Sequence, residues 1–239
     1  AGCKENNIGW SGRLNMEYDG FFFKGEYVDA GKQIVSVPAA MNGRKAENGN
    51  AQLVELGYNG RGLGLTVTGR RMERMNQRIY NHAGADPGYG TSVNMLSYRP
   101  AMSTQYTYML MTLNPYSPQV GDKVIKAGEI GGQVDAFYNF RRGTRIGGKR
   151  GMKVHANFST YYTIAQEDTF KAGNMLFKDL SVDVEKQWNR KFKSTVLWSM
   201  QEYSPSYGAN KTTWLSNIFV ADLLYKFTDT FSTRMELQY

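Results

Sequence analysis

One stretch of the chain nearly matches a phosphate-binding loop, Gly143-Thr144-Arg145-Ile146-Gly147-Gly148-Lys149-Arg150. That loop needs Ser or Thr after its Lys to hold magnesium, and a following helix whose N-terminus faces the phosphate. Here Arg150 follows the Lys, and the next residues show a strand pattern. We therefore interpret the stretch as a basic hairpin tip. Its rim of basic side chains, which would meet lipid phosphates or a partner protein, comprises Arg141, Arg142, Arg145, Lys149 and Arg150.

Histidine chemistry is restricted because only His82 and His155 occur. Two histidines cannot form a histidine-rich metal centre. His155 and Ser159 share one face of a predicted strand, and at about 3.3 Å per residue their Cα atoms lie about 13 Å apart. This separation is too long for a nucleophile–base hydrogen bond. The sequence therefore predicts no enzyme activity, no cofactor and no metal.

Acidic side chains recur at alternate positions, where Asp179, Asp183 and Glu185 share one face of a second predicted strand. Such a ladder can bind a cation, but we favour pairing with Lys and Arg across a water-filled lumen. The predicted lumen-lining residues are Lys153, His155, Asp135, Asp179, Asp183, Glu185, Arg234 and Glu236.

These residues need strands to position them, and the clearest strand is 152–162. Its apolar set is Met152, Val154, Ala156, Phe158, Thr160 and Tyr162, and its other set is Lys153, His155, Asn157, Ser159 and Tyr161. A period of two with one apolar face indicates a β-strand. The same pattern recurs over 130–140, 176–187 and 231–239. Weaker strands are expected at 8–17, 21–29, 51–58, 62–71, 92–98, 105–113, 192–203 and 213–226, which gives about twelve strands.

The connections between these strands alternate in length. Short turns are expected near 18–20, 59–61, 99–104, 141–148, 189–191 and 228–230, and longer links near 30–50, 72–91, 114–128, 164–173 and 204–212. This alternation is typical of an up-and-down barrel with tight turns on one side and loops on the other. We therefore predict an all-β, antiparallel, transmembrane β-barrel that forms a single domain over 1–239.

Composition agrees with a barrel that crosses a membrane. No apolar run approaches the roughly 18 residues of a spanning helix, whereas a spanning strand needs only about 9–11. Mean hydropathy is −0.52, which suits a polar lumen and polar loops. The net charge of +8 fits basic loops near anionic lipid head groups. We expect no nucleic-acid partner, because the Lys and Arg side chains do not gather on one helical face.

Aromatic residues make up 13% of the chain, and several lie near predicted strand ends. Rings that are apolar at one end and polar at the other favour the membrane–water boundary. The expected interface aromatics are Tyr162, Trp188, Trp198 and Trp214. Alternation alone also fits a soluble β-sandwich or a barrel with an apolar interior, but the bulky charges on the polar faces favour a lumen.

Four stretches together resemble an uncharacterised family of outer-membrane β-barrels from Bacteroidetes. They read AQLVELGYNGRGLGLTVTGRRMERM, NMLSYRPAMSTQYTYML, GEIGGQVDAFYNFRRGTRIGGKRGMKVHANFSTYY and KQWNRKFKSTVLWSMQEYSP. The resemblance covers roughly 50–239 and implies a location in the bacterial outer membrane, in contact with lipid and lipopolysaccharide. It carries no catalytic residues. Family members look longer, so we expect the chain to be a section of a larger barrel.

Two functions of different classes remain open from the sequence. One is a porin-like passive channel for small polar solutes, because a wide barrel with a mixed-charge lumen conducts unless it is plugged. The other is a non-conducting scaffold subunit that joins other outer-membrane proteins in an assembly. Loops rich in Tyr and Arg, such as 79–89 and 114–126, suit such protein contacts.

Overall fold

The computed structural model describes residues 8–36, 44–73, 78–79, 91–92, 119–120, 123–124, 128–164, 170–204 and 213–239. The long strands are β1 (Trp10–Tyr18), β2 (Phe21–Ser36), β3 (Arg44–Gly60), β4 (Leu63–Glu73), β9 (Gly128–Phe140), β10 (Met152–Ile164), β11 (Ala172–Gln187), β12 (Phe192–Tyr203), β13 (Trp214–Lys226) and β14 (Ser232–Gln238). Two-residue strands are β5 (Arg78–Ile79), β6 (Thr91–Ser92), β7 (Gln119–Val120) and β8 (Lys123–Val124). Within these ranges, no helix is long and apolar enough to cross a membrane.

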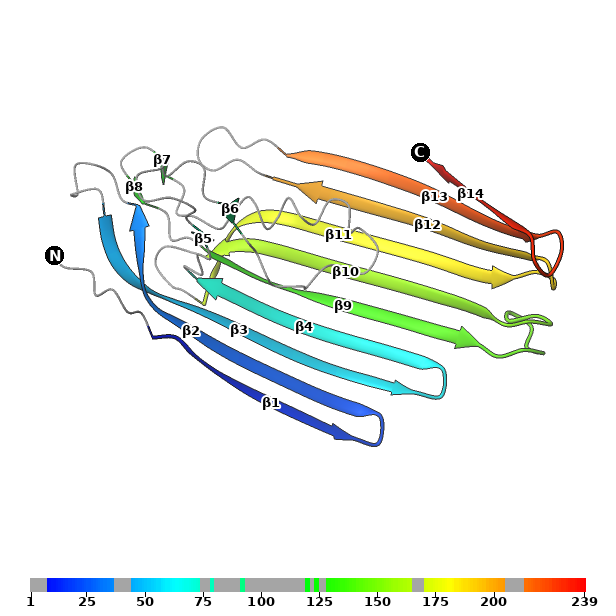
Figure 1. Ribbon diagram of the computed structural model, residues 1–239, viewed down its shortest axis with the longest axis horizontal. Coiled ribbons are helices and arrows are strands. Elements are labelled where there is room, and N and C mark those ends of the chain that lie inside the picture. The colour runs from blue at the N-terminus through cyan, green and yellow to red at the C-terminus, as the bar shows by residue number, and fades with distance from the viewer. Residues whose placement is uncertain are drawn as a thin grey trace.

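The ten long strands form one curved antiparallel sheet (Figure 1) in the order β1-β2-β3-β4-β9-β10-β11-β12-β13-β14. Each strand lies beside its neighbour in the chain except where β9 follows β4. The predicted all-β, up-and-down architecture is confirmed. Within the described ranges β1 and β14 each pair with one strand only, so the sheet is open and the predicted ring closure is not seen. The expected strands at 105–113 and over 93–98 fall outside the described residues.

Tight turns join the strands at one end of the sheet. Asp19 and Gly20 connect β1 to β2, with φ angles of 46° and 80°, and Arg61 and Gly62 connect β3 to β4, with φ angles of 54° and 88°. Two successive positive φ angles are typical of the hairpin turn whose twist matches the flanking strands. The predicted turns at 18–20, 141–148, 189–191 and 228–230 are confirmed, and the one expected at 59–61 lies at Arg61-Gly62. We call this edge the turn end.

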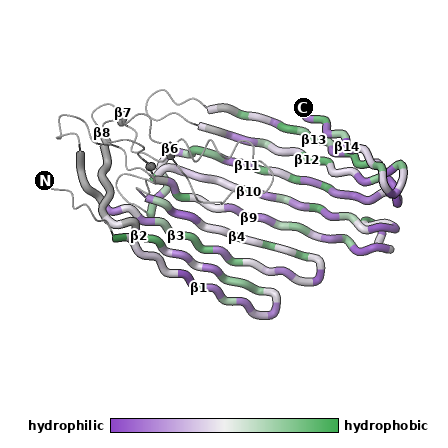
Figure 2. Tube along the Cα trace, in the orientation of Figure 1, coloured by the Kyte–Doolittle hydropathy of each residue, from purple (hydrophilic) through white to green (hydrophobic). Residues whose placement is uncertain are grey.

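The sheet has two chemically distinct faces, because side chains alternate along each strand. One register row crosses nine strands and is polar throughout: Asn15, Lys24, Glu55, Thr68, Gln133, Ser159, Asp179, Gln201 and Ser216. The adjacent row is apolar in eight strands: Met16, Phe23, Leu56, Val67, Val134, Phe158, Leu180 and Met200, followed by Asn217. Figure 2 shows the alternation along the strands. We call the sides the polar face and the apolar face.

The strands are staggered progressively in one direction. A row of paired residues runs from Tyr18 through Phe21, Tyr58, Leu65, Ala136, Ala156, Val182, Trp198 and Phe219 to Tyr239. Tyr18 is the last residue of β1 at the turn end, Ala136 lies four residues from that end of β9, and Phe219 lies seven from that end of β13. With about 3.3 Å per residue and about 4.8 Å between strands, this stagger corresponds to a strand tilt of about 30°.

Aromatic rings cover glycines on neighbouring strands of the polar face. Phe22 pairs with Gly57, and Phe137 pairs with Gly64. A Cβ added to Gly57 would lie 2.2 Å from the Phe22 ring, and one added to Gly64 would lie 2.2 Å from the Phe137 ring. Each glycine therefore makes room for a ring, and the pair fixes the register of two strands.

We expect Gly64→Ala to lower the free energy of unfolding by about 1–3 kcal/mol, because the new methyl group overpacks against Phe137. The cost should shrink below about 1 kcal/mol in a Phe137→Leu background, where the ring is gone. Gly69, in the same strand, provides the control because nothing lies within 4 Å of a Cβ added there. Urea unfolding in detergent micelles measures all four variants, and equal losses at Gly64 and Gly69 would contradict the ring-over-glycine packing.

Candidate functional site

A charged hydrogen-bond network occupies the centre of the polar face. His155 in β10 lies between two carboxylates on the neighbouring strands, with Nδ1 2.6 Å from Asp183 Oδ1 in β11 and Nε2 2.7 Å from Asp135 Oδ2 in β9. Asn157 Nδ2 also donates to Asp135 Oδ2, at 3.1 Å. A carboxylate accepts, so both ring nitrogens donate only when the imidazole carries two protons. The three strands are thus linked by a cationic ring between two anions.

This network is largely buried, as are the polar side chains around it. His155 is 8% exposed, Asp183 6% and Asn157 1%. Among the described residues, several buried polar atoms have no hydrogen-bond partner: Gln133 Oε1, Asn157 Oδ1, Ser159 Oγ, Ser181 Oγ and Gln201 Nε2. Buried polar groups are normally hydrogen-bonded, so these atoms make the centre of the polar face an unusual environment. Ser159 makes no bond to His155, as expected from their spacing.

Opposite charges pair across strands on the rest of the polar face. Arg13 lies 2.9 Å from Glu26, Lys24 lies 2.8 Å from Glu55, Lys193 lies 2.9 Å from Glu185, and Arg234 Nε lies 2.9 Å from both Asp222 oxygens. Exposed pairs of this kind contribute little stability each. They do, however, leave the face with a mixed charge along its whole width.

All eight predicted lumen residues lie on this one face: Lys153, His155, Asp135, Asp179, Asp183, Glu185, Arg234 and Glu236. That they line a lumen stays a prediction. The expected pairing of the acidic ladder with Lys and Arg is seen for Glu185, which lies 2.9 Å from Lys193. Asp183 lies beside His155, and Asp179 Oδ1 accepts from Ser199 Oγ at 2.9 Å. Within the described ranges, no cluster of His, Cys, Asp and Glu could hold a metal.

The far end of the polar face carries a buried ion pair that sequence reasoning missed. Arg70 in β4 donates to Glu129 in β9, and its guanidinium lies 4.7 Å from the centre of the Tyr161 ring. Tyr161 also packs with Leu176 and Phe177 in a small buried cluster. The pairing depends on β4 lying beside β9, and no local pattern in the sequence indicates that neighbourhood.

Aromatic rings gather on the apolar face close to the turn end. Phe21 and Tyr58 have ring centres 4.7 Å apart, and Tyr138 and Phe140 lie 4.8 Å apart. Trp188 joins them at the end of β11, is 57% exposed, and donates from Nε1 to Ser194 Oγ at 2.8 Å. Sequence reasoning selected Trp188 but missed the tyrosines and phenylalanines, although each flanks a short turn.

The other expected interface aromatics lie elsewhere. Tyr162 is on the apolar face near the end of β10 that is remote from the turn end. Trp198 is at the middle of β12, so its position differs from the strand end expected for it. Trp214 begins β13, and its side chain is outside the described residues.

The basic rim forms an ordered turn between β9 and β10. Gly143 N donates to Gly148 O at 2.7 Å, Gly148 N to Thr144 O at 2.8 Å, and Thr144 Oγ1 to Arg141 O at 2.8 Å. No helix follows, as expected for a hairpin tip. Arg141, Arg142, Arg145 and Lys149 are exposed, and Arg150 is half-buried.

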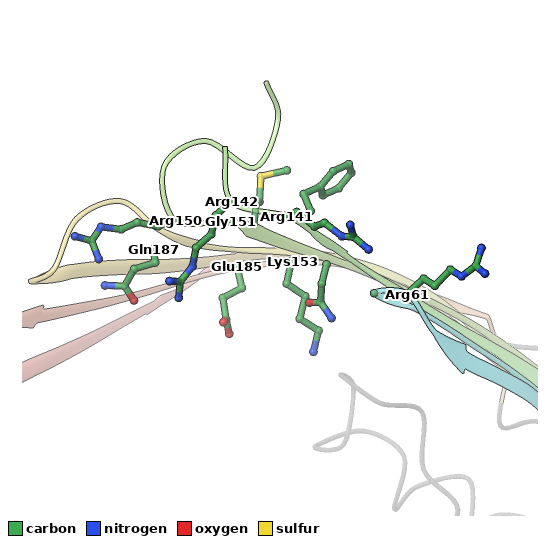
Figure 3. Close-up of a pocket in the computed structure, with 12 residues that line it drawn as sticks. Arg61, Arg141, Arg142, Arg150, Gly151, Lys153, Glu185 and Gln187 are labelled. Atoms are coloured by element: carbon green, nitrogen blue, oxygen red, sulfur yellow. The ribbon is translucent and has the colours of Figure 1, made fainter. Parts of the chain in front are cut away.

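Beside this turn lies an open hollow of about 490 Å³ (Figure 3). Its basic lining side chains are Arg61, Arg141, Arg142, Arg150 and Lys153, and Glu185 is the one carboxylate among its described lining residues. Figure 3 shows Lys153 and Glu185 extending to the same side of the sheet. Phe140 and Met152 of the apolar face also line the hollow, so it lies at the turn end between the two faces.

Comparisons with known proteins identify a family but no activity. A family model described as a family of unknown function (DUF6029) matches residues 1–239. No curated protein matches the chain.

Proposed function

This chain belongs to the family of unknown function DUF6029, and we propose that it forms the wall of an outer-membrane β-barrel whose polar lumen passes small polar solutes. One observation carries the proposal: a polar register row and an adjacent apolar row both cross nearly the entire sheet. A sheet with one side against hydrocarbon and the other against water requires this separation.

The exposure of the apolar face supports contact with lipid. Leu56 is 50% exposed, Val134 39% and Val196 52%. Soluble monomers rarely expose a contiguous apolar surface of this kind. The aromatic rings at the turn end then lie at the level of the head groups, where aromatic girdles of membrane barrels are found.

The geometry of the strands supports ring closure. A tilt of about 30° is close to the roughly 35–45° of strands in membrane barrels. A stagger that accumulates in one direction is also what closing a sheet into a barrel demands. β1 runs towards the turn end and β14 runs away from it, so these two edges are antiparallel and suited to pair directly or through further strands.

A non-conducting scaffold is the second candidate, and the burial of the central polar side chains favours it. Ser159, Asp179 and Ser181 are each 0% exposed. A wall that is covered this completely leaves less room for solutes at its centre, even though it is polar.

Planar-bilayer conductance tests the channel. We expect the purified chain to give stable unitary currents, and Thr66→Trp to reduce them because Thr66 lies on the polar face beside Asp135. Val67→Trp is the matched control, since the next residue faces the opposite side and is 43% exposed. Absence of current with co-purifying outer-membrane proteins would favour the scaffold, and equal effects at both positions would argue against a polar lumen.

A further inference from the structure

We propose that the hollow at the turn end binds a soluble phosphate-bearing anion at the mouth of the lumen. The proposal concerns the solute class and its location, so it rests on the proposed channel. The evidence is the charge, the order and the position of the groups that line the hollow.

The charge around the hollow is strongly one-sided. Five basic side chains line it, Arg61, Arg141, Arg142, Arg150 and Lys153, against the single carboxylate of Glu185. That carboxylate is already engaged by Lys193 at 2.9 Å. In the part of the chain that the structure describes, the four arginines form no ion pair. Their guanidinium groups are thus available, and such planar forks match the oxygens of phosphate in a bidentate manner.

The backbone holds these side chains on an ordered frame. The turn between β9 and β10 is closed by its own hydrogen bonds, and Gly143, Gly148 and Gly151 supply φ angles of 82°, 63° and 85°. A Cβ on Gly147 would lie 2.2 Å from Arg141 O, so the turn packs closely. Arg141, Arg142 and Arg150 therefore start from fixed positions, which lowers the entropy lost when they close on an anion.

The size of the hollow fits a small soluble ligand. A volume of about 490 Å³ lies within the roughly 300–1,000 Å³ typical of small-molecule sites. Lys153 and Glu185 belong to the polar face, whereas Phe140 and Met152, which also line the hollow, belong to the apolar face. The hollow thus borders both faces, and the test must separate a soluble anion from the phosphate of a lipid head group.

Titration calorimetry with sodium pyrophosphate in detergent at low salt tests binding without any need for conductance. We expect saturable binding to the wild-type chain and at least tenfold weaker binding to the double variant Arg142→Gln, Arg150→Gln. The double variant Lys171→Gln, Lys178→Gln is the control, because it removes two positive charges outside the lining of the hollow, one just before β11 and one in the half of β11 remote from the turn end, and should bind as the wild type does. Equal weakening in both variants, or no wild-type binding at millimolar pyrophosphate, would overturn the site.

Lipid nanodiscs distinguish the two sources of phosphate. Binding of pyrophosphate should be the same in phosphatidylcholine and phosphatidylglycerol discs, whereas loss in phosphatidylglycerol alone would assign the hollow to lipid head groups and refute a soluble ligand. The results of the binding experiment can be distinguished from the results of the conductance experiment. Current without pyrophosphate binding refutes only this site, and binding without current refutes only the channel.

Discussion

Replacing His155 by Leu is expected to lower the free energy of unfolding by about 3–5 kcal/mol, the usual cost of leaving a buried charge without its partner. The imidazole lies 2.6 Å from Asp183 and 2.7 Å from Asp135. The side chains of His155 and Asp183 are each 9% exposed. Leucine fills much of the same space but donates no hydrogen bond. Urea unfolding in lipid vesicles, followed by tryptophan fluorescence, provides the measurement.

The lost stability should be recovered when the two carboxylates that His155 had paired are neutralised. Adding Asp135→Asn and Asp183→Asn to His155→Leu is expected to restore more than half of it, because two neutral amides cost less to bury than two carboxylates. Lys153→Leu is the control on the same face of β10, where the side chain is exposed and a change within about 1 kcal/mol is expected. If His155→Leu cost no more than this control, water would already solvate both carboxylates.

The sequence was sufficient to predict which face each of these residues occupies, because alternation along one strand determines its faces. His155, Asp135 and Asp183 were all assigned to the polar side from such patterns. Alternation does not determine register, and a shift of two residues between β10 and β11 would keep every face but move Asp183 away from His155. The ion network therefore became visible only with the pairing of the strands.

The pairing of strands that are far apart in the sequence also could not be predicted. β4 pairs with β9 across residues 74–127, and this brings Arg70 to Glu129 and Phe137 over Gly64. The glycines in β3 and β4 read as weak strand residues in the sequence. Their role becomes clear only when a ring from the adjacent strand occupies the space that a side chain would fill.

These contacts divide the sheet into regions with different tasks. The rings over Gly57 and Gly64 fix the register, the His155 network ties the central strands, and the basic hollow lies where the polar face meets the turn end. None of these features requires lipid by itself. The membrane assignment depends on the apolar face, and a test of that face must change one side of a strand while sparing the other.

Val196 and Thr195 in β12 allow such a test because they are adjacent and point to opposite faces. Val196 pairs with Val184 and Ala221 on the apolar face, whereas Thr195 lies between Glu185 and Asp222 on the polar face. In vesicles, Val196→Arg should lower the free energy of unfolding by about 2–4 kcal/mol, as for an arginine near the middle of a bilayer. Thr195→Arg places the same charge between two carboxylates and should change stability by less than about 1 kcal/mol.

The environment of the apolar face follows from comparing these two variants. Val196 is 52% exposed, so an arginine there would extend into water at almost no cost if the protein were soluble, since exposed surface changes are usually within about 0.5 kcal/mol. A chain that stays monomeric without detergent and tolerates Val196→Arg as well as Thr195→Arg would refute the membrane assignment. The opposite result would place this face against hydrocarbon: Val196→Arg alone lowers the free energy of unfolding in vesicles, and the loss is smaller in short-chain detergent, where the head groups are closer.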